Sequence, residues 1–156
     1  MNRISLENDI LDFLKICNQF KVKYLVVGGF AVSIHGYPRS TKDLDVCIEL
    51  SEDNALKMLE VIDEFGFSSL NLKKDDFLKK DFITQIGYPP LRIDILNDLD
   101  GVSFEEAWNF KKEVLIENIP VFFIGYNQLL TVKKKSGRPQ DLADIHHLEK
   151  KRNKNK

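Results

Sequence analysis

The feature that most constrains this chain is the run from Asp43 to Leu50, in which polar and apolar side chains alternate strictly. Such alternation predicts a β-strand with one apolar face and one polar face. Asp43 and Asp45 lie on the polar face, and a spacing of two residues along a strand places their carboxylates roughly 7 Å apart in one cleft. Like charges at that separation repel, so the pattern favours a divalent cation bound by oxygen ligands.

A second run, Leu91 to Leu96, also alternates, with Ile93 and Ile95 on one face and Asp94 on the other. If this strand pairs beside the first, Asp94 joins the same cleft. Two carboxylates about 4 Å apart, without a cation, would repel by about 4 kcal/mol at an effective dielectric of about 20. Three carboxylates around one or two metal ions are the arrangement that phosphoryl-type chemistry uses.

An apolar run, Tyr24 to Val27, stops at Gly28 and Gly29. The pair predicts a tight turn from a strand to a helix, and backbone N–H groups at the start of a helix bind phosphate. Gly28 and Gly29 are therefore candidate phosphate ligands. The loop before the Asp43 strand carries three further candidates, for which a capped turn is the alternative interpretation: Arg39, Thr41 and Lys42.

The segment from Gly28 to Asp45, together with Asp94 and a C-terminal stretch that contains Gly137-Arg138-Pro139, resembles the nucleotidyltransferase superfamily of the DNA polymerase β type. It is most similar to small stand-alone prokaryotic members related to minimal nucleotidyltransferases and AbiEii-like proteins. The resemblance covers roughly residues 6–149. It implies an α/β (α+β) nucleotidyltransferase fold, with a mixed, mostly antiparallel sheet, helices packed on one side and a C-terminal helical segment.

The resemblance also implies an activity and site residues. A nucleoside monophosphate would move from a nucleoside triphosphate such as ATP to a hydroxyl acceptor. Asp43, Asp45 and Asp94 would ligate Mg²⁺, for which Mn²⁺ can substitute, and Asp94 would also orient or deprotonate the acceptor. Lys133 and Arg138 would contact the triphosphate or the nucleotide, and a charged helix end is the alternative interpretation.

Asp141 is interpreted as a helix cap and Asp144 as a carboxylate on the helix surface. Alternatively, Asp141 holds Arg138 in place. Many family members carry Gly-Ser where this chain has Gly28-Gly29. The phosphate contact must then come from backbone N–H groups rather than from a hydroxyl.

An alternative function comes from the same resemblance. Small proteins of this fold act with a small helical partner as half of a toxin–antitoxin pair. The contact with such a partner is expected at the acidic cleft and at exposed Phe or Tyr residues near Tyr88 to Leu91. The sequence does not decide whether the acceptor is an antibiotic, a protein side chain or an RNA end.

The bulk composition fits a single domain over residues 1–150, followed by a frayed basic tail over residues 151–156. The net charge of −1 gives no overall basic field that would attract nucleic acid. Cys17 and Cys47 match no zinc or CxxC spacing, which favours a reducing cytoplasm. The polar N-terminus resembles no signal peptide, and no apolar stretch is long enough to span a bilayer.

Periodicity, caps and breakers predict the elements. The expected helices are 5–20, 30–36, 52–65, 103–109, 126–135 and 139–150. The expected strands are 24–27, 43–50, 80–87, 91–97, 113–116 and 121–124, with 80–87 and 91–97 joined as a hairpin.

Overall fold

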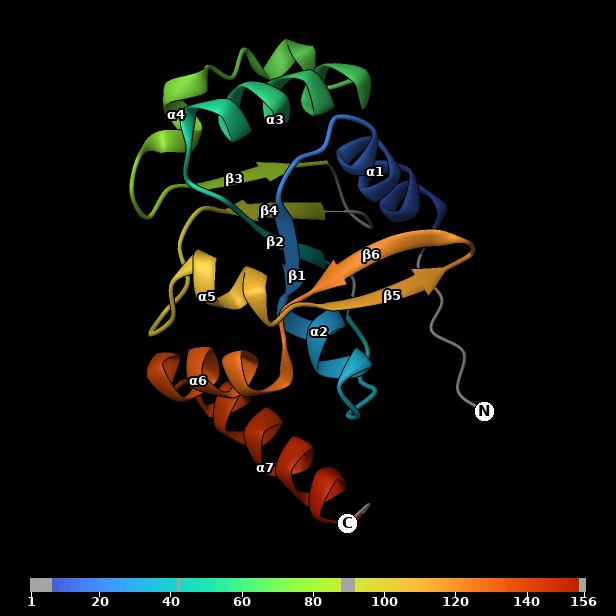
Figure 1. The fold of residues 1–156 in the computed structure, drawn as a ribbon, viewed down its shortest axis with the longest axis vertical. Helices are drawn as coiled ribbons and strands as arrows, with labels where there is room; N and C mark the ends of the chain where they lie inside the picture. Colours follow the sequence, from blue (N-terminus) through green and yellow to red (C-terminus); the bar gives the residue numbers. More distant parts are fainter. Residues whose placement is uncertain (1–6, 42, 88–91, 155–156) are drawn as a thin grey trace.

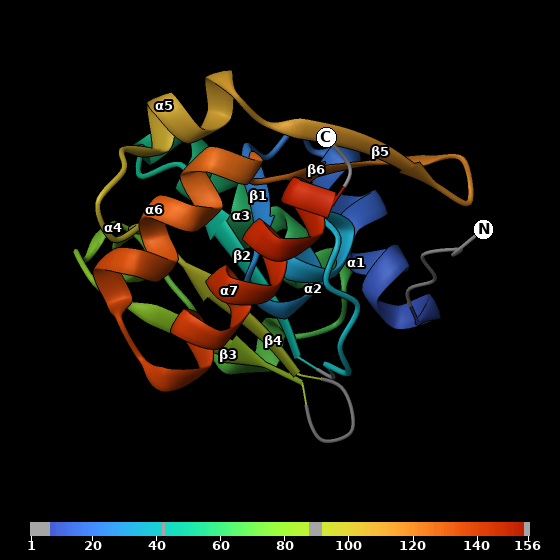
Figure 2. The same cartoon turned by 90° about the horizontal axis from the view of Figure 1, so that it is seen from below.

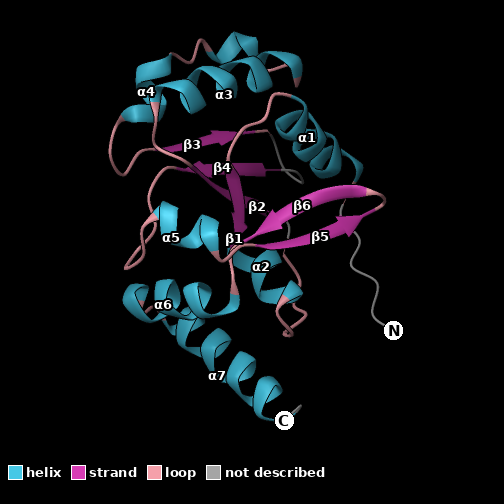
Figure 3. Ribbon diagram, in the orientation of Figure 1, coloured by secondary structure: helices cyan, strands magenta, loops and turns pink. Residues whose placement is uncertain are grey.

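The structure is a computed structural model that describes residues 7–41, 43–87 and 92–154. Its centre is one open sheet in the order β3-β4-β2-β1-β6-β5 (Figure 3). The strands are β1 (Tyr24–Val27), β2 (Asp43–Ile48), β3 (Ile83–Ile86), β4 (Arg92–Leu96), β5 (Lys112–Ile116) and β6 (Ile119–Phe123). The pairs β3/β4, β1/β2 and β5/β6 are antiparallel, whereas β2/β4 and β1/β6 are parallel. The predicted mixed, mostly antiparallel sheet is confirmed.

The pairing of β2 with β4 places the site. The two strands run parallel in a register that sets Asp45 opposite Asp94 and Asp43 opposite Arg92. Residues opposite each other in neighbouring strands project from the same face of the sheet. The adjacency expected for the two aspartate strands is therefore confirmed, as is the hairpin that places β3 on the far side of β4.

In the orientation of Figure 1, α1, α3 and α4 lie above the sheet, and α6 and α7 lie below it. Figure 2 shows α7 running beneath β1, β2 and α2. The helices are α1 (Asn8–Gln19), α2 (Gly28–Ile34), α3 (Glu52–Glu64), a 3₁₀ turn η1 (Ser68–Leu70), α4 (Lys74–Leu78), α5 (Phe104–Asn109), α6 (Tyr126–Ser136) and α7 (Pro139–Lys154). None of them, over the residues described, is long and apolar enough to cross a membrane.

Local sequence explains where several helices begin and end. The Ser51 hydroxyl accepts the Asn54 N–H at the start of α3, and the Ser103 hydroxyl accepts the Glu106 N–H at the start of α5. Such N-caps satisfy amide groups that have no partner within the helix. Gly137 ends α6 in the left-handed conformation, with φ of 66°, which glycine adopts without a steric penalty.

The apolar face of β2 packs into the core, with Leu44, Val46 and Ile48 almost fully buried. Cys47 is buried as well, although it lies on the carboxylate face. On the polar face of β2, only the first two side chains, Asp43 and Asp45, are therefore partly exposed. This burial restricts the candidate site to one end of the strand.

Several element predictions differ from the structure. Strand β3, predicted over 80–87, spans only Ile83–Ile86, and strand β2, predicted over 43–50, ends at Ile48. Helix α2 starts at Gly28, two residues earlier than predicted, because the glycine turn itself forms the first helical turn. Helix α4 was not predicted, since its five residues are too few to show a helical period. Helix α7 continues to Lys154 into the segment expected to be a frayed tail. Basic side chains in the last turn of a helix interact favourably with its dipole, which supports that extension.

Candidate active site

The candidate site is a cleft of about 470 Å³ where the turn between β1 and α2, the strands β2 and β4, and the C-terminal helices meet. Every described residue that was predicted from the sequence as a site residue lines it: Gly28, Gly29, Arg39, Thr41, Asp43, Asp45, Asp94, Lys133 and Arg138. Lys42 lies outside the described residues, as does the predicted partner contact from Tyr88 to Leu91. The fold thus brings together segments that are up to 110 positions apart in the sequence, from Gly28 to Arg138.

Asp43, Asp45 and Asp94, here called the strand carboxylates, face one guanidinium group, that of Arg92, which contacts Asp43 and Asp94. The Arg92 Nη2 atom lies 3.1 Å from Asp43 Oδ2, and Arg92 Nε lies 3.1 Å from Asp94 Oδ1. Arg92 Nη2 also donates a hydrogen bond of 3.2 Å to Asp94 Oδ2. One positive charge therefore faces three negative ones, and the group keeps a surplus of negative charge.

That surplus appears in the protonation of Asp45. The pKa of Asp45 is raised to about 6, first by burial and then by the charges of Asp94 and Asp43 and a hydrogen bond with Asp94, against a smaller lowering by Arg92. Burial and like charges both disfavour the ionised form. The negative charge of the strand carboxylates is thus larger than the single guanidinium of Arg92 can neutralise.

The two glycines are required by the same geometry. Gly28 has a φ of +67°, and a Cβ there would collide with Asp45 Oδ2. A Cβ at Gly29 would lie 2.8 Å from Thr41 Oγ1. Larger residues at either position would push against the carboxylate strand or the loop that precedes it. The turn therefore brings backbone amides close to the strand carboxylates, which is the arrangement expected of a phosphate-binding turn.

The opposite charge balance is found around Asp141 and Asp144, here called the helix carboxylates. Asp144 is fully buried and Asp141 is 2% exposed, so the prediction of a surface charge and a simple cap is wrong. The reason is that three cations converge on them, here called the helix-side cations: Arg39, Lys133 and Arg138.

The helix carboxylates bind these cations at close range. Lys133 Nζ lies 3.1 Å from Asp141 Oδ1 and 2.9 Å from Asp144 Oδ2, with the Lys133 side chain only 7% exposed. Arg39 Nη2 donates a 3.1 Å hydrogen bond to Asp144 Oδ2, and Arg138 Nε donates a 2.8 Å bond to Asp141 Oδ2. The alternative interpretation, that Asp141 holds Arg138, is therefore confirmed.

These contacts outweigh desolvation at Asp141. Burial by itself raises the pKa of this carboxyl, but hydrogen bonds from Arg138, Lys133 and Ser136, with the charge of Lys133, bring it down to about 2. Hydrogen bonds to the ionised form favour that form. The helix-side cations exceed the helix carboxylates by one, so this wall of the cleft carries a surplus of positive charge.

Besides Asp141, sequence reasoning missed three charged residues of the cleft. Asp98 and Asp100 line it from the loop after β4, where no periodic pattern marked them. Arg92 is the third, and its signal was present, because the alternation of β4 places it on the same face as Asp94.

The strand carboxylates fit a hard divalent cation by their chemistry, since oxygen ligands are what Mg²⁺ and Mn²⁺ prefer. As they stand, no three acidic, histidine or cysteine side chains over the residues described are arranged as a ready metal site. The Arg92 guanidinium contacts both Asp43 and Asp94, so it already pairs with oxygens that a cation would use. Metal binding at this site therefore requires Arg92 to move.

Solved structures share this architecture over nearly the whole chain. A candidate nucleotidyltransferase from Thermotoga maritima aligns with a TM-score of 0.60 at 13% identity, covering 93% of this chain and 94% of that one. The lincosamide antibiotic adenylyltransferase LnuA, solved with lincomycin bound, aligns with a TM-score of 0.57 at 15% identity, covering 95% and 98%. ANT(2″)-Ia, in complex with adenylyl-2″-tobramycin, aligns with a TM-score of 0.54 at 11% identity, covering 89% and 84%.

No protein-family model and no curated protein matches the sequence. The likeness is therefore one of structure, and it covers 93% and 95% of this chain for the first two of these proteins. With the sheet order, the glycine turn and the strand carboxylates in place, the chain has the nucleotidyltransferase fold.

Proposed function

We propose that the chain is a divalent-metal-dependent nucleotidyltransferase that moves a nucleoside monophosphate from a nucleoside triphosphate to a hydroxyl acceptor. The observation that carries the proposal is the register of β2 and β4, which sets Asp45 opposite Asp94 at the mouth of a cleft that the Gly28 turn also lines. Carboxylates for a cation and amides for phosphate then meet in one place.

In the proposed reaction the acceptor oxygen attacks the α-phosphorus of the triphosphate. A bond forms between that phosphorus and the acceptor oxygen, and the bond from the α-phosphorus to the bridging oxygen breaks, so that pyrophosphate leaves. Asp94 receives the proton of the acceptor hydroxyl as a general base. Its side chain is only 13% exposed, which limits competition from bulk water for the same carboxylate.

Asp43, Asp45 and Asp94 would hold the cation, Mg²⁺ or Mn²⁺. When bound, it supplies charge neutralisation for the triphosphate oxygens and for the leaving pyrophosphate. The surplus of negative charge on the strand carboxylates supports a cation here, because Arg92 alone leaves it uncompensated.

The rest of the triphosphate would lie between the glycine turn and the helix-side cations. The amides of Gly28 and Gly29 donate to phosphate oxygens, while Arg39, Lys133 and Arg138 supply the surplus positive charge of the opposite wall. Arg138 is the most exposed of these cations, with its side chain 76% accessible, and so can turn toward a ligand at the smallest cost in buried contacts.

The acceptor is a hydroxyl compound of a class that the neighbours suggest. LnuA is a lincosamide antibiotic adenylyltransferase, and ANT(2″)-Ia was solved with adenylyl-2″-tobramycin. A small hydroxylated molecule is therefore the first acceptor class to test. The cleft volume of about 470 Å³ is in the range of small-molecule sites.

The test is a transfer assay with α-³²P-labelled ATP, GTP, CTP and UTP, Mg²⁺ or Mn²⁺, and in turn lincomycin, tobramycin and a cell lysate as sources of acceptor. We expect one labelled product that requires metal. Asp94→Asn should lower its rate about 10²–10⁴-fold, the usual contribution of a general base. Asp12→Asn, an exposed aspartate of α1, is the matched control and should keep the wild-type rate. Label transfer that survives in Asp94→Asn would overturn the proposed role.

The toxin–antitoxin pair with a helical protein partner stays a prediction. Of the surface expected to contact that partner, Tyr88 to Leu91 lies outside the described residues, and the acidic cleft serves the proposed transferase equally. Three further statements also stay predictions: cytoplasmic localisation, the single-domain boundary at residue 150, and the use of ATP rather than another triphosphate.

A further inference from the structure

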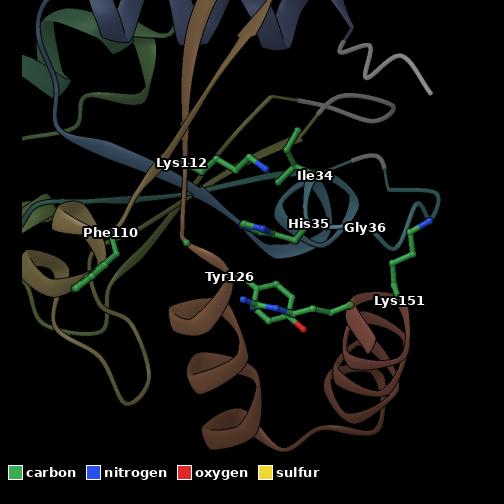
Figure 4. A pocket seen from close by; sticks show the side chains of 9 residues that line it. Ile34, His35, Gly36, Phe110, Lys112, Tyr126 and Lys151 are labelled. Atoms are coloured by element: carbon green, nitrogen blue, oxygen red, sulfur yellow. The ribbon is translucent and has the colours of Figure 1, made fainter. Parts of the chain in front are cut away.

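A second pocket, of about 450 Å³, lies at the far end of α2 from the glycine turn. It is formed where the end of α2, the start of β5, the start of α6 and the end of α7 come together. Figure 4 shows Lys112 and Tyr126 on either side of His35, with Lys151 reaching from α7 past Gly36. Helix α2 has seven residues, so its two ends, at the glycine turn and at this pocket, here called the basic pocket, are about 10 Å apart at 1.5 Å per residue.

The basic pocket differs from the cleft in its charges. Its lining holds Lys112, Lys151 and Arg152 and no carboxylate among the residues described. None of these three cations has an aspartate or glutamate within 4.0 Å over the described parts of the chain, whereas Arg39, Arg92, Lys133 and Arg138 of the cleft all do. Cations that are clustered and unneutralised attract anions.

The pocket is also built rather than an accidental hollow between surface side chains. Arg152 is held with its guanidinium carbon 4.2 Å from the centre of the Tyr126 ring. His35 donates from Nε2 to the carbonyl oxygen of Ile124 at 2.6 Å, which joins the end of α2 to the strand that precedes α6. The residues that line the pocket are therefore held together by a cation–π contact and a hydrogen bond.

Two glycines keep the pocket open. Gly36 has a φ of +124°, and a Cβ there would lie 3.1 Å from Lys151 Cγ. A Cβ at Gly125 would collide with the carbonyl oxygen of Phe110. Both positions therefore need glycine for the backbone and Lys151 to approach as they do.

An aromatic ring stands at the rim of the same pocket. Phe110 is 64% exposed, an unusual state for a phenylalanine, and it lines the pocket together with the half-buried Tyr126. Exposed aromatic rings beside unneutralised cations are the combination that binds nucleotides, because the bases stack on the rings and the phosphates pair with the cations.

We propose that the basic pocket binds a nucleotide, with its phosphate at Lys112, Lys151 and Arg152 and its base against Phe110. The ligand is either a free nucleotide or the end of a single strand, since both present the same phosphate and base. The binding needs no divalent cation, because the pocket supplies the positive charge itself. It is therefore independent of the reaction proposed for the cleft.

The test uses AMP, inorganic phosphate and a single-stranded RNA octamer, each titrated into the wild-type chain in EDTA by calorimetry and by amide NMR. We expect AMP to bind more tightly than phosphate, with the largest amide shifts at Gly36 and Gly125 rather than at Gly28 and Gly29. An octamer that binds at least tenfold more tightly than AMP identifies a strand end, and equal affinities identify a free nucleotide.

The variant Lys112→Gln/Arg152→Gln should weaken AMP binding at least tenfold. The matched control is Lys15→Gln/Lys134→Gln, which removes the same charge from exposed sites on α1 and α6 and should stay within twofold of wild type. Equal losses in the two double variants would overturn the site, because only the overall charge would matter. Phosphate that binds as tightly as AMP would overturn the nucleotide assignment, and shifts confined to Gly28 and Gly29 would place the ligand in the cleft instead.

Discussion

The cleft contains two groups of aspartates whose surroundings are opposite in charge. The strand carboxylates face the single guanidinium of Arg92, and the pKa of Asp45 is raised to about 6. The helix carboxylates are surrounded by the three helix-side cations, and the pKa of Asp141 is lowered to about 2. The strand carboxylates thus face too few cations to neutralise them, whereas the helix carboxylates are outnumbered by the cations that they contact.

The comparison separates two uses of the same residue type. A carboxylate that is neutralised within the fold holds other side chains in place, and its removal destabilises the protein. A carboxylate that the fold leaves under-neutralised is destabilising until a ligand supplies the missing charge. A triphosphate with its cation would complete both groups, since the cation meets the strand carboxylates and the phosphates meet the helix-side cations.

The largest effect is expected at Asp144. Asp144→Asn leaves Arg39 and Lys133 facing a neutral amide in a buried position, and breaking a buried ion pair on one side costs about 3–5 kcal/mol. Urea unfolding monitored by circular dichroism measures this loss. The control Glu149→Gln, an exposed residue of the same helix, should change the free energy of unfolding by less than about 0.5 kcal/mol. Equal stabilities for the two variants would mean that the network contributes nothing.

Asp45→Asn should have the opposite sign. Without metal at pH 7, the variant should be more stable than wild type by about 2–3 kcal/mol, because a pKa raised from 3.8 to about 6 disfavours the ionised folded state. As the pH falls from 7 toward 4, Asp45 becomes protonated in the folded state and the wild type should approach the variant. Chemical unfolding at several pH values in EDTA checks both statements. A variant that is less stable at pH 7 would make Asp45 a structural residue.

Asp141 should set the acid limit of stability. Its folded pKa of about 2 lies below the usual value of 3.8 for an aspartate, so it contributes about 2 kcal/mol above pH 4 that is lost as the pH falls toward 2. Stability measured from pH 5 to pH 2 should therefore decline more steeply in wild type than in Asp141→Asn. Parallel curves for the two proteins would show that Asp141 is not ionised in the folded state over this range.

Arg92→Gln gives the smallest effect. Arg92 pairs with oxygens that a cation would use, so its removal should tighten binding of Mn²⁺ alone by up to about tenfold, or 1.4 kcal/mol. Lys57→Gln removes the same charge from α3 and should leave the affinity unchanged. Calorimetry with Mn²⁺ measures both. Weaker Mn²⁺ binding in Arg92→Gln would mean that the arginine supports the cation site instead of competing with it.

The mixed, mostly antiparallel sheet was implied by the family resemblance, whereas the order of its six strands was not predicted. The sequence was sufficient for the strand carboxylates, because alternation in β2 and β4 fixes both the strand and the face of each aspartate. It was insufficient for the helix carboxylates. The residues that neutralise Asp144 lie at Arg39, 105 positions away, and at Lys133 on another helix. Such pairing depends on tertiary packing, which no local period encodes. Helix α4 was missed for the opposite reason, since its five residues carry too little local signal.

The most direct test of the central claim, that the strand carboxylates receive a cation with a triphosphate, is a thermal unfolding series with Mg²⁺, ATP and both together. Ligand at tenfold its dissociation constant should stabilise wild type by about 1.4 kcal/mol, or roughly 3–6 °C for a chain of this size. The shift should exceed the sum of the separate shifts and should vanish in Asp43→Asn, which removes a ligand charge at a half-exposed position without changing its shape. Equal shifts in wild type and Asp43→Asn would contradict the account, because the nucleotide would then bind elsewhere.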